Sequence, residues 1–154
     1  MSYDLNQFRS LIVRTLDEVC LRVAASGIDV TDMILGTAAQ ESSFGHYLHQ
    51  LEPGPGLGAF SIEPETFRWL REHFLHRWPD RLTDAKAEQL EWDLRLGIFI
   101  CRLRYLVIEE AIPRDLAGMA SYWKRYFNTA KGRGTVQEFT GNYVRFILGG
   151  HAGH

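Results

Sequence analysis

The segment 94–108 constrains the fold of this chain more than any other part of its sequence. It reads LRLGIFICRLRYLVI and would be apolar on most sides of a helix, although arginines stand at positions 95, 102 and 104. Such a run is too short to span a bilayer comfortably. A helix that is apolar nearly all round is normally enclosed by the rest of a domain. We therefore expect a long helix from Thr83 to about Glu110 at the centre of the protein.

Apolar residues recur at helical spacing through most of the remaining chain. They predict further helices at 4–25, 31–41, 64–76, 113–127 and 135–148, with a break at 78–80. Gly36 and the alanines at 38 and 39 leave room for another helix to approach the second one closely. No alternating stretch is long enough for a sheet, and no internal repeat stands out. The prediction is a mainly α single domain over residues 1–148, followed by a flexible tail at 149–154.

Composition agrees with one folded domain and weighs against several classes of function. The 154 residues are close to the commonest domain size, and the 45% hydrophobic content is ample for a core. A net charge of -2 provides no global basic field for nucleic acid or for an anionic membrane. Cys20 and Cys101 both fall in apolar runs, and small disulfide-held domains usually carry more cysteines. We expect two buried free thiols.

Two glutamates flank the segment 45–62, which lacks helical periodicity and contains PGPG at 53–56. Glu41 ends the apolar run MILGTAAQ, and Glu63 stands directly before Pro64. The segment between them is expected to form a loop or short hairpin that lines a cleft. Apolar surroundings raise the pKa of a carboxyl, as a general acid for glycoside hydrolysis requires. Taken alone, Glu41 reads more readily as a solvated residue at a helix end, and Glu63 as an acid favoured by the positive end of the next helix.

Three segments, in this order, resemble the lysozyme-like superfamily, specifically soluble lytic transglycosylases and goose-type lysozymes of phage type. The first is Glu41-Ser42 with the trailing Ser-Phe-Gly. The second is the segment 58–62, GAFSI, in which Ser61 stands where the family usually has Gln. The third is the segment 122–128, YWKRYFN, a looser match in which Tyr126 and Asn128 are the nearest equivalents.

The resemblance implies cleavage of peptidoglycan between N-acetylmuramic acid and N-acetylglucosamine, without a metal or cofactor. Glu41 would be the general acid, and Ser42 would help to position it or a substrate group. Glu63 would hold a water in the manner of goose-type lysozymes, whereas lytic transglycosylases need no second acid. The substrate-binding residues expected are a cleft wall whose backbone binds the N-acetyl arm (Gly58, Phe60, Ser61, Ile62), a tyrosine near the acid (Tyr126), its neighbour Asn128 and a groove-lining Trp123.

The N-terminus shows no secretory signal, and no wall-binding repeat is visible. The expected setting is a phage virion, or the host cytoplasm with release to the periplasm. Peptidoglycan glycan strands and other virion proteins are the expected partners, with no nucleic acid and no membrane insertion. The alternative is a non-catalytic lysozyme-like module kept for assembly or glycan binding, with Ser61 marking lost activity. The histidine pairs at 46/49 and 73/76 lack further ligands nearby, so no metal site is expected.

Overall fold

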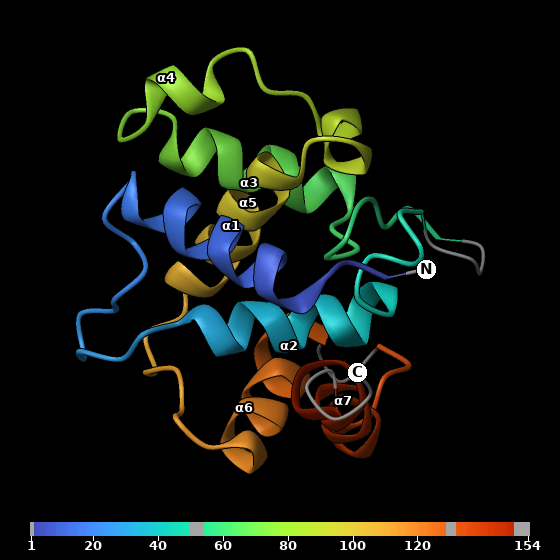
Figure 1. Ribbon diagram of the computed structural model, residues 1–154. Coiled ribbons are helices and arrows are strands. Elements are labelled where there is room, and N and C mark those ends of the chain that lie inside the picture. Colours follow the sequence, from blue (N-terminus) through green and yellow to red (C-terminus); the bar gives the residue numbers. More distant parts are fainter. Residues whose placement is uncertain (1, 50–53, 129–131, 150–154) are drawn as a thin grey trace.

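The computed structural model describes residues 2–49, 54–128 and 132–149 (Figure 1). Within these ranges, extended backbone pairs only as isolated bridges, so the mainly α class is confirmed. The helices, in chain order, are α1 (Leu5–Asp17), α2 (Thr31–Ser42), α3 (Pro64–Phe74), α4 (Pro79–Leu82), the 3₁₀ helix η1 (Ala87–Glu91), α5 (Leu94–Leu106), α6 (Leu116–Tyr122), the π-helical η2 (Trp123–Asn128), α7 (Val136–Tyr143) and the π-helical η3 (Val144–Leu148).

Helix α5 occupies the centre of the molecule, as its apolar sequence predicts. It contacts α1, α2, α3, η1 and η2, and residues 97–103 are all buried. The expectation of one long helix from residue 83 is wrong, because α5 begins only after Asp93, whose carboxylate accepts a hydrogen bond from the N–H of Leu96 at 3.0 Å. The preceding residues form η1, where the side chain of Gln89 accepts from the N–H of Lys86 at 2.6 Å.

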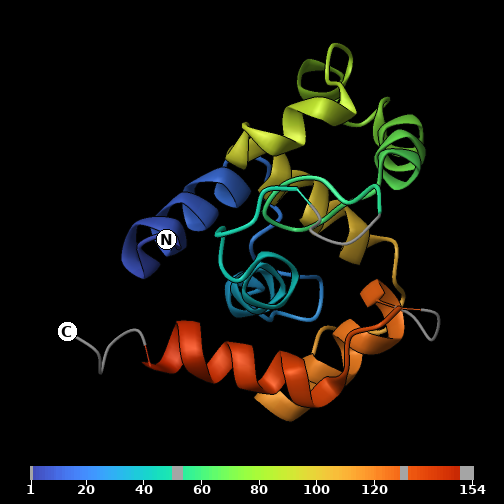
Figure 2. The ribbon, with the colours of Figure 1, turned by 90° about the vertical axis from the view of Figure 1, so that its right-hand side faces the viewer.

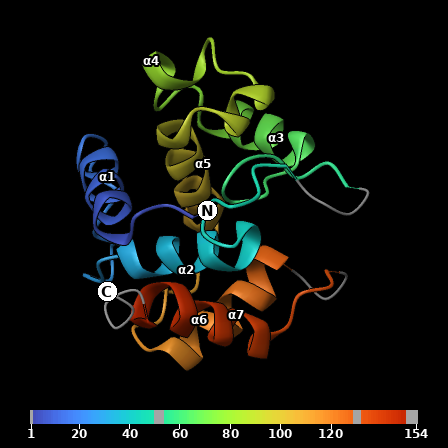
Figure 3. The same cartoon turned by 45° about the vertical axis from the view of Figure 1, so that its right-hand side comes forward.

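Helix α2 lies between two groups of helices (Figures 2 and 3). It packs against α1 and α5 on one side and against α7 on the other. A Cβ placed on Gly36 would lie 2.7 Å from the ring of Phe139, so α7 uses the space that this glycine leaves. The predicted close approach of another helix at Gly36 is confirmed.

Helix α1 ends at Asp17, eight residues earlier than its periodicity predicts. Arg22 binds the carboxylates of Asp17 and Asp29 at 2.7 and 2.5 Å, and Cys20 adopts a left-handed φ of 58°. These contacts turn the chain back into a loop before α2. One consequence is that Cys20 is exposed, whereas Cys101 is buried, so the prediction of two buried thiols is correct only for Cys101.

The remaining helix ends agree with the sequence in part. Pro64 opens α3 and Thr135 caps α7, both as predicted. A break is present at Trp78, where the backbone is not helical, but Pro79 and Asp80 already belong to the short α4. Helix α6 begins at Leu116 after the cap Asp115 rather than at 113. Most of the predicted tail, residues 150–154, lies outside the described residues.

Candidate active site

Glu41 lies in the last turn of α2, where the helix end is held by its own neighbours. The hydroxyl of Ser42 donates to the carbonyl of Ala38 at 3.0 Å and accepts from the N–H of Gly45 at 2.8 Å. Residues 43–45 all have positive φ, at 49°, 58° and 83°, which ends the helix sharply. Ser42 is 1% exposed and bonds only backbone atoms, so it positions the acid and does not reach a substrate group.

The carboxyl of Glu41 has surroundings that favour its protonated form. The indole nitrogen Nε1 of Trp123 donates a hydrogen bond to Oε2 of Glu41 at 2.9 Å. Burial raises the pKa of Glu41 above its usual 4.5, and the bond from Trp123 offsets part of the rise because it favours the charged form, so that the net pKa is about 7. Glu41 nevertheless keeps part of its surface accessible. It can therefore hold a proton near neutral pH and still meet a second molecule.

Among the residues that the structure describes, no basic side chain forms an ion pair with the carboxyl of Glu41. Within the described ranges it takes part in no ion pair, and only burial and Trp123 act on its pKa. A nearby cation would favour the ionised form and would remove the proton needed for acid catalysis.

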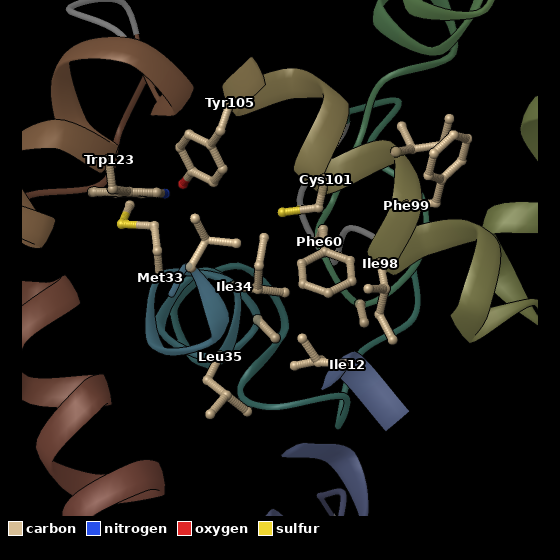
Figure 4. Close-up of a cluster of buried hydrophobic side chains, with 14 of the residues drawn as sticks. Ile12, Met33, Ile34, Leu35, Phe60, Ile98, Phe99, Cys101, Tyr105 and Trp123 are labelled. Carbon is tan, nitrogen blue, oxygen red and sulfur yellow. The ribbon is translucent and has the colours of Figure 1, made fainter. Parts of the chain in front are cut away.

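Helix α5 contributes two further side chains to the surroundings of Glu41. Cys101 and Tyr105 lie one helical turn apart, are both buried, and both have pKa values raised by burial and by the charge of Glu41. Both groups therefore stay neutral at physiological pH. The hydroxyl of Tyr105 lies 2.7 Å from that of Thr37, one turn before Glu41 on α2. Figure 4 shows Cys101, Tyr105 and Trp123 converging on one side of α2.

Trp123 is the first residue of η2 and is fully buried. Its ring packs on Phe139 of α7 with centroids 5.4 Å apart, and a Cβ placed on Gly134 would lie 2.5 Å from it. The prediction that Trp123 lines a groove is wrong, since its ring has no free face for a sugar. Its contribution to the site is the hydrogen bond to Glu41.

Tyr126 packs in a group of aromatic side chains, and its place beside the acid stays a prediction. Its ring packs edge-on against Tyr122 with centroids 4.8 Å apart, and the nearby carboxylate of Glu110 raises the pKa of its hydroxyl. Glu41 is not among the groups that act on the pKa of Tyr126. The tyrosine electrostatically coupled to Glu41 is Tyr105.

Asn128 closes the connection between η2 and α7. Its side-chain oxygen accepts a hydrogen bond from the ammonium of Lys124 at 2.7 Å. The same ammonium donates to the carbonyls of Gly132 and Gly134 at 3.1 and 2.6 Å. Asn128 thus holds Lys124, and its predicted contact with a substrate stays a prediction.

The segment 58–62 forms a tight turn. Leu57 and Ile62 exchange both backbone hydrogen bonds, at 3.0 and 3.1 Å, and the N–H of Ser61 donates to the carbonyl of Gly58 at 3.1 Å. The expected loop or short hairpin is therefore present as a turn closed by isolated bridges.

Most side chains of this turn belong to the core and cannot contact a ligand. Phe60 and Ile62 are 1% and 3% exposed, and Figure 4 shows Phe60 among the buried side chains. Gly58 has a φ of 78°, and a Cβ on it would lie 2.2 Å from the carbonyl oxygen of Leu90. Ser61 is partly exposed with a φ of 50°, but its N–H is already bonded within the turn, so binding of an N-acetyl arm by this segment stays a prediction.

Glu63 is exposed at the N-cap position of α3, and its side chain makes no capping hydrogen bond. It is not among the groups that act on the pKa of Glu41. A role for Glu63 in holding a water stays a prediction.

The buried partners of Glu41 on α5 were missed from the sequence. The available signal was a tyrosine on a helix that is apolar nearly all round, since a buried hydroxyl needs a hydrogen-bond partner. The partner, Thr37, lies 68 positions away from Tyr105. No local pattern could have identified it.

Among the described residues, no three side chains of His, Cys, Asp or Glu gather as a metal ion would require. In the same ranges, no helix is both long enough and apolar enough to cross a membrane. Comparisons of the chain with protein-family models, with curated proteins and with solved structures found no match.

Proposed function

We propose that this protein is a muramidase that cleaves the glycan strands of peptidoglycan, with Glu41 as the general acid. The observation that carries the proposal is a partly accessible carboxyl whose pKa is raised to about 7 and which forms no ion pair within the described parts of the chain. General acids of glycosidases need a pKa raised in this way so that they can protonate the leaving oxygen. The three sequence segments that resemble lysozyme-like enzymes supply the substrate class.

The hydrogen bond from Trp123 gives the two oxygens of the Glu41 carboxyl different tasks. Oε2 accepts from the indole, so Oε1 is the atom that holds the proton and delivers it to the glycosidic oxygen. Once the proton has left, the indole N–H stays on a carboxylate, and hydrogen bonds to charged groups are stronger than those to neutral ones. Trp123 therefore supports the acid in its product state.

Two reaction outcomes fit this site. A water held by Glu63 would give a hydrolase with a reducing end, and attack by the sugar's own hydroxyl would give an anhydro product without a second acid. In the virion or lysis setting expected from the sequence, either product would open the wall. Near-normal turnover by Glu63→Gln would support the anhydro route.

The decisive experiment incubates purified peptidoglycan with the wild type and with Glu41→Gln, and identifies the products by mass spectrometry. We expect Glu41→Gln to lose at least about 10²-fold in rate, since general acid catalysis contributes about 10²–10⁴. Glu88→Gln, an exposed glutamate of η1, serves as the matched control and should cleave normally.

Absence of wild-type products would overturn the proposal. If the wild type then still bound glycan strands, the protein would be the non-catalytic module considered above. Equal cleavage rates for Glu41→Gln and the wild type would instead show that Glu41 is not the general acid.

A further inference from the structure

We propose that a pocket between α3 and α5 binds the stem peptide that peptidoglycan carries on its muramoyl sugars; the identity of this ligand rests on the proposed function. The cavity has a volume of about 300 Å³ and is lined by Glu65, Thr66 and Trp69 of α3 and by Arg104 of α5. Small-ligand sites span roughly 300–1,000 Å³, so this pocket has room for a short segment of substrate.

Trp69 gives the pocket an exposed apolar surface. Its side chain is 53% exposed, although the chain buries most of its other large aromatic residues. The indole is stacked on His73, with ring centroids 4.9 Å apart and planes 11° from parallel. Because this stacking restrains the ring in advance, a ligand that packs on it costs less side-chain freedom. Tryptophan is also enriched among the residues that dominate binding energy.

Arg104 gives the pocket a positive charge that forms no ion pair with a described carboxylate. Burial lowers the pKa of Arg104, yet an arginine stays charged at any physiological pH. Its guanidinium lies 5.8 Å from the ring centroid of Phe127, and no described carboxylate is in ion-pairing contact with it. A guanidinium in this state is suited to bind a carboxylate through two parallel hydrogen bonds.

Glu65 adds the opposite charge to the same cavity without pairing with Arg104. A neutral sugar chain would use neither charge. A short peptide that carries carboxylates, an amino group and small aliphatic side chains would use both charges and the indole of Trp69. The stem peptide of peptidoglycan has this chemistry.

The pocket adjoins the surroundings of the acid. Arg104 directly precedes Tyr105, whose pKa responds to the charge of Glu41. The ring of Phe127 links the two, because it lies near the guanidinium of Arg104 and 5.4 Å from the ring of Tyr105. A muramoyl unit bound beside Glu41 could therefore extend its peptide over α3.

The test uses the full chain with Glu41→Gln, so that no ligand is consumed, and measures binding by calorimetry. The two probes are a soluble muramyl tripeptide, which carries the stem, and chitotriose, which has none. Trp69→Ala and Arg104→Met are compared with the controls Trp92→Ala and Arg68→Gln, whose exposed side chains lie outside the pocket.

We expect each pocket variant to weaken binding of the muramyl tripeptide by about tenfold or more and to leave chitotriose unchanged, while both controls match the parent. Trp69 is exposed, so its removal tests the pocket even if Arg104→Met folds poorly. No binding of the tripeptide, or equal weakening for both probes, would overturn the proposed pocket.

Cleavage assays with proteins that keep the wild-type Glu41 separate this inference from the proposed function. If intact glycan strands are not cleaved while the tripeptide still depends on Trp69 and Arg104, the proposed function fails and the pocket stands as a peptide site. If strands with and without stem peptides are cleaved equally and the pocket variants bind normally, the pocket fails and the function stands.

Discussion

At the scale of single residues, Glu41 is subject to two opposing influences. Burial raises its pKa, and the hydrogen bond from Trp123 lowers it, with a net value of about 7. A carboxyl balanced in this way responds to small changes in either influence. Both the burial and the hydrogen bond can be altered by substitutions at other residues, with Glu41 unchanged.

The rate of glycan cleavage is expected to fall above pH 7, because Glu41 then loses the proton that it must donate. kcat/KM should decline by about tenfold per pH unit beyond an apparent pKa near 7. Trp123→Phe removes the indole donor, so the pKa of Glu41 should rise and the decline should move to higher pH. A pH–rate profile of both proteins measures the shift.

Trp92→Phe provides the matched control for this profile, since Trp92 is 68% exposed. The decline of kcat/KM with pH in Trp92→Phe should coincide with that of the wild type. A shift to lower pH for Trp123→Phe would mean that the indole does not stabilise the ionised acid.

Glu41 also makes folding stability depend on pH. Its pKa is higher in the folded protein, about 7, than the unperturbed 4.5, so the folded state binds more protons between these values. The free energy of unfolding therefore falls as pH rises through this window. The full loss above pH 7 is about 3 kcal/mol, at about 1.4 kcal/mol per pKa unit.

Glu41→Gln should escape this loss, because an amide carries no charge and can still accept from Trp123. We expect the variant to be more stable than the wild type at pH 8.5 by up to about 3 kcal/mol, and similar to it at pH 5. Urea unfolding at the two pH values measures the difference. A variant that is less stable at both would show that the carboxyl holds the fold together.

The sequence identified Glu41 because its signal is local: an apolar helix, the following Ser42 and a glycine-ended turn. It could not identify Cys101 or Tyr105 as neighbours, because α5 reaches Glu41 only through the tertiary fold. Trp123 was recognised as part of a motif but was given the wrong role, since burial of an aromatic ring depends on packing from α7.

At the scale of elements, the connection between η2 and α7 determines how tightly Trp123 is held. The ammonium of Lys124 gathers Asn128, Gly132 and Gly134 by three hydrogen bonds. This arrangement brings the backbone of Gly134 against the indole. The backbone of Gly134 therefore helps to hold the indole of Trp123, which donates the hydrogen bond to Glu41.

Gly134→Ala should disturb the packing of residue 134 against the indole of Trp123. Its Cβ would lie 2.5 Å from the indole and 3.1 Å from the side chain of Gln40, and the buried indole has little room to move. We expect a loss of about 1–3 kcal/mol in unfolding free energy together with slower cleavage. Thermal unfolding and the peptidoglycan assay measure the two effects.

Gly141→Ala is the matched control, because its Cβ would meet nothing within 4 Å on the exposed side of α7. It should be neutral or should stabilise the protein by up to about 1 kcal/mol, as expected for alanine in a helix. Equal destabilisation by the two variants would contradict the role given to Gly134.

The helices that could be predicted accurately are those with local end signals. Thr135 and Pro64 fix the starts of α7 and α3 through their own backbone and side-chain chemistry. The early end of α1 could not be predicted, because it depends on Arg22 joining Asp17 to Asp29. The apolar periodicity predicted a helix up to residue 25, whereas the ion pairs of Arg22 hold residues 18–25 as a loop.

At the scale of the whole molecule, Arg102 ties the central helix to the loop before α2. It is 3% exposed, and its Nε donates to the carbonyl of Leu21 at 2.8 Å across 81 positions of sequence. A buried carbonyl that loses its donor is costly, typically by about 1–3 kcal/mol. This contact therefore contributes to the stability of the domain as a unit.

Arg102→Met should destabilise the protein by about 1–3 kcal/mol, because it keeps the bulk of the side chain but removes the donor to Leu21. Arg95→Met on the same helix removes only an exposed ion pair with Glu18 and should cost about 0–1 kcal/mol. Urea unfolding midpoints at an unchanged slope give both values. Equal losses of unfolding free energy in the two variants would show that the buried hydrogen bond of Arg102 contributes no more to stability than the exposed ion pair of Arg95.

The hydrogen bonds of Ser42 have a consequence for how the protein can be altered. They fix the end of α2 from within residues 38–45, before the chain enters the segment that leads to Gly58. The described start of the loop is tied to the same helix end, because the N–H of Tyr47 donates to the carbonyl of Ser42 at 3.0 Å, and the N–H of Gly58 donates to the carbonyl of Leu48 at 2.8 Å. A change of loop sequence that is meant to leave Glu41 in place should therefore keep residues 42–49 and 57–58 and vary only the positions between them.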